Sequence, residues 1–304
     1  MELNITSSPH LRTKDDTKGI MLDVIIALAP ATVFGVLMFG FSALVTIAVC
    51  VASALASEVL ACWIMKKPLS TGDLTAVVTG LLLALNLPAG IPIYMAAIGS
   101  AFAIIVGKML FGGLGKNIVN PALIGRVFML IAFSSAMTTF KEPLSDLVAT
   151  ATPLANGEYT FSQIFFGVCS GTIGETSVAM ILLGGVYLVL RKIITLEIPL
   201  SFILTSFIIA LIAGQNPFSA VCSGGLMLGA VFMATDYVTS PMTRLGKIVF
   251  GIGCGAITMV IRLFCSLPEG VSYSIIIMNL LVPIIDRFVS VRPLGAKREV
   301  AKND

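Results

Sequence analysis

Apolar residues occur in long, evenly spread runs along this 304-residue chain, and short polar connections separate them. Ten such segments can be marked, at about residues 20–39, 43–64, 74–87, 93–110, 122–136, 178–190, 196–212, 220–234, 248–264 and 271–285. A straight transmembrane helix needs about 20 residues of this kind. The pattern therefore predicts an all-α membrane protein with about ten transmembrane helices.

Several of these segments are well short of a full span. The shortest, such as 74–87 and 178–190, predict broken or tilted helices. Irregular backbone at membrane depth survives only where protein or water satisfies its polar groups, so we expect these helices to line an internal site.

The composition supports one membrane domain over residues 1–304. Hydrophobic residues make up 57% of the chain, and mean hydropathy is +1.01. Charged residues make up 12%, whereas about 25% is typical of soluble domains. No small-residue cleavage site follows the polar residues 1–19, so we interpret them as a retained arm and not a signal peptide. Residues 140–175 form the longest connection, and residues 286–304 form a polar tail.

The positive charges predict the orientation, since lysine and arginine concentrate in short cytoplasmic connections. With ten spans and the N-terminus inside, all but two of the 19 lysines and arginines fall in inner connections, Lys108 and Arg126 among them. The exceptions are Lys141 in the long connection and Arg262 in the outer half of the ninth segment. Both termini are therefore predicted to be cytoplasmic, and residues 140–175 to form an outer loop.

A weak internal symmetry is also present. Thr79-Gly-Leu-Leu-Leu in the third segment recurs as Gly224-Gly-Leu-Met-Leu in the eighth. Five spans in each half would give the halves opposite orientations, which is the inverted-repeat arrangement of many transporters. Chance similarity among apolar residues explains the match equally well, so the repeat is only a suggestion.

The sequence disfavours metal and haem chemistry. The only histidine is His10, in the arm, so a haem held by two intramembrane histidines is excluded. The six cysteines are scattered singly without a C-x-x-C pair, which is typical of small buried hydrophobes. No zinc-ligand spacing, catalytic triad or nucleic-acid motif is present. We therefore expect no structural metal and no nucleic-acid partner.

The inner connection before the fifth segment is rich in glycine and asparagine, and reads Gly112-Gly-Leu-Gly-Lys-Asn-Ile-Val-Asn-Pro-Ala122. A phosphate-binding P-loop needs Ser or Thr directly after the lysine, and Asn117 stands there instead. Two interpretations stay open. The glycines allow close approach of a flat ligand such as a flavin, whose ring edge Asn117 and Asn120 can bind. Alternatively, one asparagine caps the fifth helix, with Pro121 in its first position.

Five acidic residues lie within or at the rims of the predicted spans, namely Asp23, Glu58, Asp73, Asp236 and Asp286. Ionisable groups at membrane depth are costly, so each is a candidate for an ion pathway or for a satisfied pair. Asp236 lies in an oxygen-rich end of an apolar helix, and hard cations prefer oxygen ligands. We select Asp236, Glu58 and Asp73 as ion-pathway candidates. Arg262 is interpreted either as a side chain that extends to the interface or as the partner of an outer anionic group.

The outer loop holds a short polar stretch, Asp146-Leu-Val-Ala-Thr-Ala-Thr-Pro-Leu154, with an acid six residues before a threonine. Read alone, Thr152 is a solvated turn residue, because Ser and Thr hydroxyls bond nearby backbone. Thr152 becomes a candidate site residue only when this stretch is considered together with other segments of the chain.

Together with residues 112–122, residues 73–88 and Pro9-His-Leu-Arg12, this stretch resembles a family of membrane flavoprotein subunits. The family includes the D subunit of the Rnf complex and the B subunit of the sodium-translocating NADH:quinone oxidoreductase. The likeness covers essentially the whole chain, and the short arm is similar to the Rnf version.

The resemblance implies a covalent FMN. In that family FMN is joined through its phosphate to a threonine in a D-x-x-[S/T]-G-A-T motif, and the matching residues are Asp146 as the leading acid and Thr152 as the acceptor. Ala149 and Thr150 stand where the motif has Ser or Thr and Gly. Thr150 is therefore a second acceptor to test.

The resemblance also implies a noncovalent riboflavin near the inner surface, contacted by Asn117 and Asn120. It implies a subunit of an ion-pumping ferredoxin:NAD oxidoreductase in the cytoplasmic membrane of a prokaryote. Electrons would pass from the outer FMN back toward the cytoplasmic side, coupled to Na⁺ or H⁺ translocation. The implied partners are the A, B, C, E and G subunits of an Rnf-like complex and a flavin transferase.

Two rival functions are kept. One is a secondary transporter or channel for a small solute without redox activity, which the repeat and the short helices suggest. The other is a structural membrane scaffold with no cofactor. Covalent flavin on the chain would distinguish the redox function from both.

Overall fold

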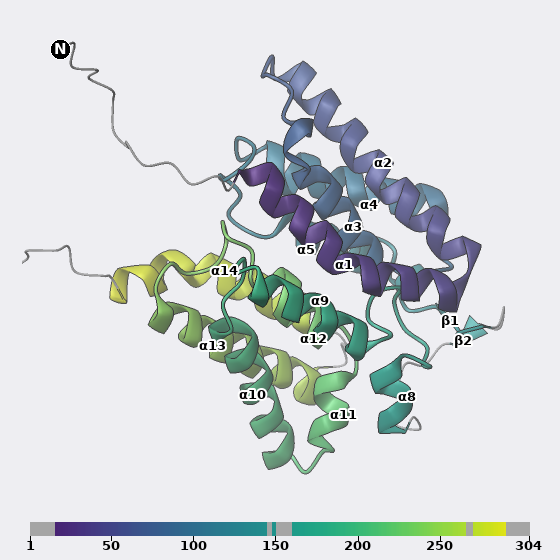
Figure 1. The fold of residues 1–304 in the computed structure, drawn as a ribbon, viewed down its shortest axis with the longest axis vertical. Coiled ribbons are helices and arrows are strands. Elements are labelled where there is room, and N and C mark those ends of the chain that lie inside the picture. Colours follow the sequence, from purple (N-terminus) through teal and green to yellow (C-terminus); the bar gives the residue numbers. More distant parts are fainter. Residues whose placement is uncertain (1–15, 145–147, 150–159, 266–269, 290–304) are drawn as a thin grey trace, which may run out of the picture.

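The computed structural model describes residues 16–144, 148–149, 160–265 and 270–289. The regular structure in these ranges is almost entirely helical (Figure 1). Two short strands, β1 (Phe140–Lys141) and β2 (Val148–Ala149), pair antiparallel. The predicted all-α membrane class is confirmed. The flavin-attachment candidates Asp146, Thr150 and Thr152 lie outside the described residues.

Nine apolar helices of the described chain match nine of the ten predicted segments. Four are long enough to cross a membrane: α1 (Thr17–Phe39), α2 (Phe41–Ile64), α13 (Arg244–Phe264) and α14 (Val271–Phe288). Five are shorter: α3 (Thr75–Leu85), α4 (Ile93–Ile104) with its π-helical continuation η2 (Ile105–Met109), α5 (Pro121–Ala132), α9 (Val178–Leu190) and α10 (Glu197–Ile212). Short connecting helices are η1 (Thr71–Asp73), α6 (Ser134–Met137) and α8 (Phe161–Phe166).

The eighth predicted segment is a broken helix, as its length suggested. It consists of α11 (Pro217–Cys222), α12 (Leu226–Leu228) and the π-helix η3 (Gly229–Met233). The break falls at Gly224, whose φ of +66° lies in the left-handed region that glycine adopts without steric cost. A Cβ at Gly225 would collide with the carboxylate of Glu175. The two glycines therefore allow the chain to bend closely around a buried acid.

The helices form two groups that follow the order of the chain (Figure 1). In the first group α2 packs against α3 and α4, and α4 packs against α5. In the second group α10 packs against α13, and α13 packs against α14. The groups meet where α1 contacts α9 and α5 contacts α14. Helices at equivalent positions therefore pack in the same way in the two groups, as a five-plus-five repeat requires. The inverted orientation of the two halves stays a prediction.

Glycines bring several helices into close contact. A Cβ at Gly184 in α9 would collide with the carbonyl of Ala27 in α1. A Cβ at Gly251 in α13 would collide with Ser201 and the carbonyl of Ile198 in α10. Small residues at helix interfaces let backbones approach closely, which is typical of membrane proteins.

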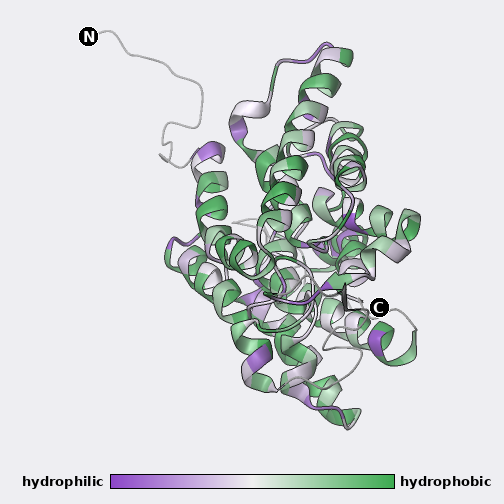
Figure 2. Cartoon of the chain, turned by 90° about the vertical axis from the view of Figure 1, so that its right-hand side faces the viewer, coloured by the Kyte–Doolittle hydropathy of each residue, from purple (hydrophilic) through white to green (hydrophobic). Residues whose placement is uncertain are grey.

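The outward surface of the helices is apolar. Figure 2 shows hydrophobic residues along most of the helix length. Large apolar side chains such as Phe264 and Ile212 are 81% and 80% exposed. A soluble protein rarely exposes so much contiguous apolar surface, and a lipid environment accounts for it.

The structure corrects the assignment of two positive charges. Lys108 and Arg126 were counted among residues of the inner connections, and this is wrong. Lys108 lies in η2 and Arg126 in α5, and they are only 3% and 1% exposed. Each has an acidic partner inside the protein, Glu58 and Glu175 respectively. Neither therefore contributes to the charge pattern that orients the chain.

Candidate functional site

A pocket opens beside the first turns of α1 and is enclosed by parts of both helix groups. Its volume is about 870 Å³, counted with the solvent-open space at its mouth. Ligand pockets combine apolar walls with a few polar groups. Most of the lining is apolar, and its polar side chains are Thr75, Thr79, Lys108, Asn117, Asn120, Thr235, Asp236 and Tyr237.

Asn120 both caps a helix and lines this pocket. Its side-chain oxygen accepts a hydrogen bond from the Ala122 backbone N–H at 3.0 Å, with Pro121 at the first position of α5. The capping interpretation is thereby confirmed. Its amide nitrogen donates to the carbonyl of Met233 in η3 at 3.1 Å. Asn120 therefore holds α5 against the broken eighth segment at the pocket wall.

Asn117 and Asp236 meet at the same pocket. Asn117 donates to the carbonyl of Val119 at 3.3 Å and lines the pocket together with Asp236. Asp236 accepts a hydrogen bond from the Thr239 hydroxyl at 3.0 Å. Loss of water around the carboxyl raises the pKa of Asp236, and the Thr239 hydroxyl and the nearby Asn117 amide act in the opposite direction. Asn117 and Asn120, predicted to contact a flavin, and Asp236, predicted to lie on an ion pathway, thus line one site.

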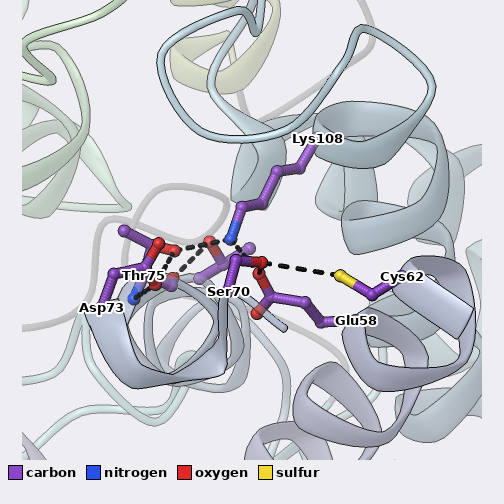
Figure 3. Close-up of polar contacts among 7 residues, drawn as sticks. Glu58, Cys62, Ser70, Asp73, Thr75 and Lys108 are labelled. Atoms are coloured by element: carbon purple, nitrogen blue, oxygen red, sulfur yellow. Dashed lines mark hydrogen bonds and ion pairs between the residues drawn. The ribbon is translucent and has the colours of Figure 1, made fainter. Parts of the chain in front are cut away.

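Lys108 brings a buried ion pair to the pocket wall (Figure 3). Its Nζ lies 2.6 Å from Oε1 of Glu58 and 2.5 Å from the hydroxyl oxygen of Thr75. Glu58, in α2, is completely buried. Its second carboxylate oxygen, Oε2, has no hydrogen-bond partner in the described part of the chain. The pair connects α2, α3 and η2 directly behind the pocket.

Asp73 belongs to the same network (Figure 3). Thr75 donates its hydroxyl to Asp73 Oδ1 at 2.7 Å and its backbone N–H to the same oxygen at 3.1 Å. Ser70 donates to Glu58 at 2.5 Å, and the Cys62 sulfur lies 3.7 Å from the Ser70 hydroxyl. The hydrogen bonds therefore run without interruption from half-buried Asp73 to buried Glu58. All three acids selected from the sequence lie in the pocket wall or in the network behind it.

The described residues give no sign of a structural metal site. No group of three or more His, Cys, Asp or Glu side chains is close enough to hold a metal ion in the described ranges. Asp236 and its neighbours Thr235, Tyr237 and Val238 line the pocket.

A second buried ion pair could not be predicted from the sequence. Arg126 in α5 lies 2.7 Å from Glu175, which precedes α9, and also donates to the side-chain oxygen of Asn86 after α3. All three are at least 91% buried. The sequence shows an arginine inside an apolar segment, which indicates a buried charge. It does not show which acid lies next to that arginine.

Arg262 lies in the last turn of α13 and reaches the end of α11. It donates to the carbonyls of Ala220 at 2.6 Å and Ser223 at 3.2 Å. Carbonyls at a helix C-terminus have no partner within the helix. Arg262 supplies hydrogen bonds to such carbonyls where the eighth segment is broken. A role for Arg262 toward an outer anionic group stays a prediction.

Comparison with known proteins identifies the family. Residues 4–295 match the model of the NQR2, RnfD, RnfE family. The chain belongs to this family. It is 47% identical to the D subunit of a Na⁺-translocating ferredoxin:NAD⁺ oxidoreductase complex from Acetobacterium woodii, over 98% of this chain and 97% of that protein.

Two further relatives are similar over nearly their whole length. The chain is 41% identical to the D subunit of a proton-translocating ferredoxin:NAD⁺ oxidoreductase complex from Clostridium ljungdahlii, over 97% of this chain and 96% of the relative. It is 38% identical to the D subunit of an ion-translocating oxidoreductase complex from Stutzerimonas stutzeri, over 91% of each. Membership of the NQR2, RnfD, RnfE family confirms the resemblance inferred from the sequence motifs.

Proposed function

We propose that the chain is the membrane flavoprotein subunit of an ion-translocating ferredoxin:NAD⁺ oxidoreductase complex, itself a redox-driven translocase. Two relatives of 41% and 47% identity are named as D subunits of such complexes, and a third of 38% identity is named as the D subunit of an ion-translocating oxidoreductase complex. The observation that carries the proposal is the pocket, which joins apolar walls and amide groups to a buried network of acids. The relatives are named for Na⁺ in one case and for protons in another, so the transported cation is Na⁺ or H⁺.

The first carrier in this proposal is an FMN esterified to Thr152, with Asp146 as the leading acid of the attachment motif. A chain with one histidine and singly scattered cysteines needs another electron carrier, and a flavin supplies one- and two-electron chemistry. A phosphoester bond would keep this carrier at the outer surface. Electrons then leave toward the cytoplasmic side.

The second carrier is a noncovalent flavin, riboflavin, in the pocket. The pocket fits such a ring, because apolar residues such as Leu82 and Phe232 line it together with Asn117 and Asn120. Both Asn120 polar atoms already have protein partners, so its role is to shape the wall, whereas Asn117 is half-buried and offers amide atoms to the ring edge. A flavin bound here would supply a redox centre directly against the Lys108–Glu58 network.

Cation movement in this proposal is coupled at the same place. Asp236 lines the pocket, and Asp73 and Glu58 lie in the hydrogen-bond network behind it. An Asp236→Asn variant is expected to lose Na⁺- or H⁺-coupled transport in vesicles while it keeps its flavins. Intact transport in that variant would remove Asp236 from the pathway.

The partners in this proposal are the A, B, C, E and G subunits of an Rnf-like complex and a flavin transferase that loads FMN. The location is the cytoplasmic membrane of a prokaryote. The multi-pass helical fold and the naming of the relatives as members of a complex support this assignment.

Covalent fluorescence tests the proposed function. The chain is coexpressed with a flavin transferase, denatured and run on a gel under ultraviolet light. We expect a fluorescent band that disappears in Thr152→Val and persists in Thr150→Val. The reverse result would make Thr150 the acceptor. A dark band in the parent protein would favour a non-redox transporter or a scaffold without a cofactor.

A further inference from the structure

Lys108 is the only cationic residue among the described residues that line the pocket. It lies in the π-helix η2, and π-helical turns inside α-helices are frequent at functional sites. The preceding Gly107 packs so closely against Pro121 that a Cβ there would lie 2.9 Å from the Pro121 Cα. This turn is therefore pressed against the start of α5, beside the asparagines of the pocket.

The donors of Lys108 are only partly used. A lysine ammonium has three N–H donors. Its two hydrogen bonds in the described structure go to Glu58 and Thr75. The Thr75 hydroxyl donates its own proton to Asp73, so it can accept from Lys108 without conflict. One N–H of Lys108 is therefore left for a ligand in the pocket that its side chain lines.

We propose that Lys108 stabilises the negative charge that the pocket ligand gains when it accepts an electron, and that Glu58 holds the ammonium while the ligand is oxidised. This inference rests on the proposed function, since it needs a flavin ring in the pocket. One electron, delivered by a reduced carrier of the same complex, changes the net charge of a neutral ring from zero to minus one, and no bond forms or breaks. Lys108 then shares its charge between the ring and Glu58.

The burial of the pair makes this response strong. Lys108 is 3% exposed and Glu58 is fully buried, so little water screens their charges. A cation beside the ring stabilises the reduced form and raises its midpoint potential. Glu58 lies behind that cation and lowers the potential by a smaller amount. Asp236, the acid that lines the same pocket, also acts against the cation.

Redox titration of the noncovalent flavin in the purified complex tests this inference. The signal of that flavin is isolated as the difference from the same complex after the noncovalent flavin has been extracted. We expect the midpoint potential to be highest in Glu58→Gln, lower in the parent, lower again in the double variant Lys108→Met/Glu58→Gln, and lowest in Lys108→Met. Lys116→Met is the matched control, because this exposed lysine lies in the connection that follows η2. It should leave the potential unchanged.

Two results would overturn the inference. One is a Lys108→Met complex that keeps its flavin with the same potential as Lys116→Met. The other is loss of the noncovalent flavin from both Lys108→Met and the double variant, because Lys108 would then bind the oxidised ring itself. If Lys108→Met alone loses the flavin, the double variant is compared with the parent. A lower midpoint potential in the double variant supports the inference, and an equal or higher one overturns it. A parent complex without noncovalent flavin contradicts the pocket assignment in the proposed function, and this inference fails with it.

Discussion

The Asn120 side-chain amide donates to the carbonyl oxygen of Met233 at 3.1 Å, across 113 residues of sequence. Both residues are almost fully buried. The same side chain caps α5 through the Ala122 N–H. One asparagine thus fixes the start of a first-group helix to a π-helix of the second group, at the wall of the pocket.

Asn120→Ala should destabilise the protein and empty the pocket together. Loss of the cap costs about 1 kcal/mol, and the buried Met233 carbonyl left without its donor costs about 1–3 kcal/mol more. Thermal unfolding in detergent and extraction of noncovalent flavin measure the two effects. Asn216→Ala is the control, because Asn216 caps α11 through Phe218 and Ser219 and does not line the pocket. Equal behaviour of the two variants would contradict the prediction.

The Lys108–Glu58 pair should show strongly non-additive stability. Removal of one partner of a buried ion pair leaves an uncompensated charge and costs roughly 3–5 kcal/mol. We expect Lys108→Met and Glu58→Gln each to lower the free energy of unfolding by about this much, and the double variant to lose clearly less than their sum. A double-mutant cycle by denaturant titration in detergent measures the coupling. Additive losses would show that the two side chains do not interact.

The tight contact of α13 with α10 should make Gly251 intolerant of a methyl group. A Cβ at Gly251 meets the Ile198 carbonyl, which cannot move aside, so Gly251→Ala should cost about 1–3 kcal/mol. Gly253→Ala is the matched control. Its Cβ meets the end of the flexible Met278 side chain, which can shift. Differential scanning calorimetry of the two variants should show the lower melting temperature for Gly251→Ala. The opposite order would contradict the tight contact between α10 and α13 at Gly251.

Asp236 should make stability depend on pH. Because the folded-state pKa is raised, the charged carboxylate disfavours the folded state, and stability falls as pH rises from the unfolded pKa near 3.8 through the folded value. Asp236→Asn removes this penalty. The variant should therefore gain melting temperature relative to the parent at pH 8 and differ less from it near pH 4, close to the unfolded pKa. A constant difference across this range would mean that Asp236 titrates normally.

The apolar runs predicted the helices well, because lipid requires continuous apolar segments and satisfied backbone. The sequence also predicted, as one of two interpretations, that Asn117 or Asn120 caps the fifth helix, and it predicted that short segments are broken or tilted. The structure shows that Asn120 is the cap and that the eighth segment is the broken one. The pairing of Lys108 with Glu58 was not predicted, because these residues are 50 positions apart and nothing in the sequence specifies their contact. The sequence alone does not distinguish a lysine that is ion-paired inside the protein from a lysine in a cytoplasmic loop. For this reason Lys108 and Arg126 were assigned to connections.

The sequence likewise could not predict which residues come together in the pocket. Asn117 and Asp236 lie in different segments and have different predicted roles, and only the folded chain shows that they line the same pocket. The stretch around Thr152, which we propose as the FMN attachment site, shows the reverse case. There the order of residues carries the prediction, and chemistry on the purified chain must test it.

The ion pair between Arg126 and Glu175 limits how this protein can work. Arg126 comes from α5 in the first group, and Glu175 directly precedes α9 in the second. A carrier that alternates access by rocking its two halves would have to pull these opposite charges apart inside a dry interior at every cycle. In the function proposed above, the pair holds the two groups together at this point, and electrons and small cations would travel through the chain while these helices stay in place.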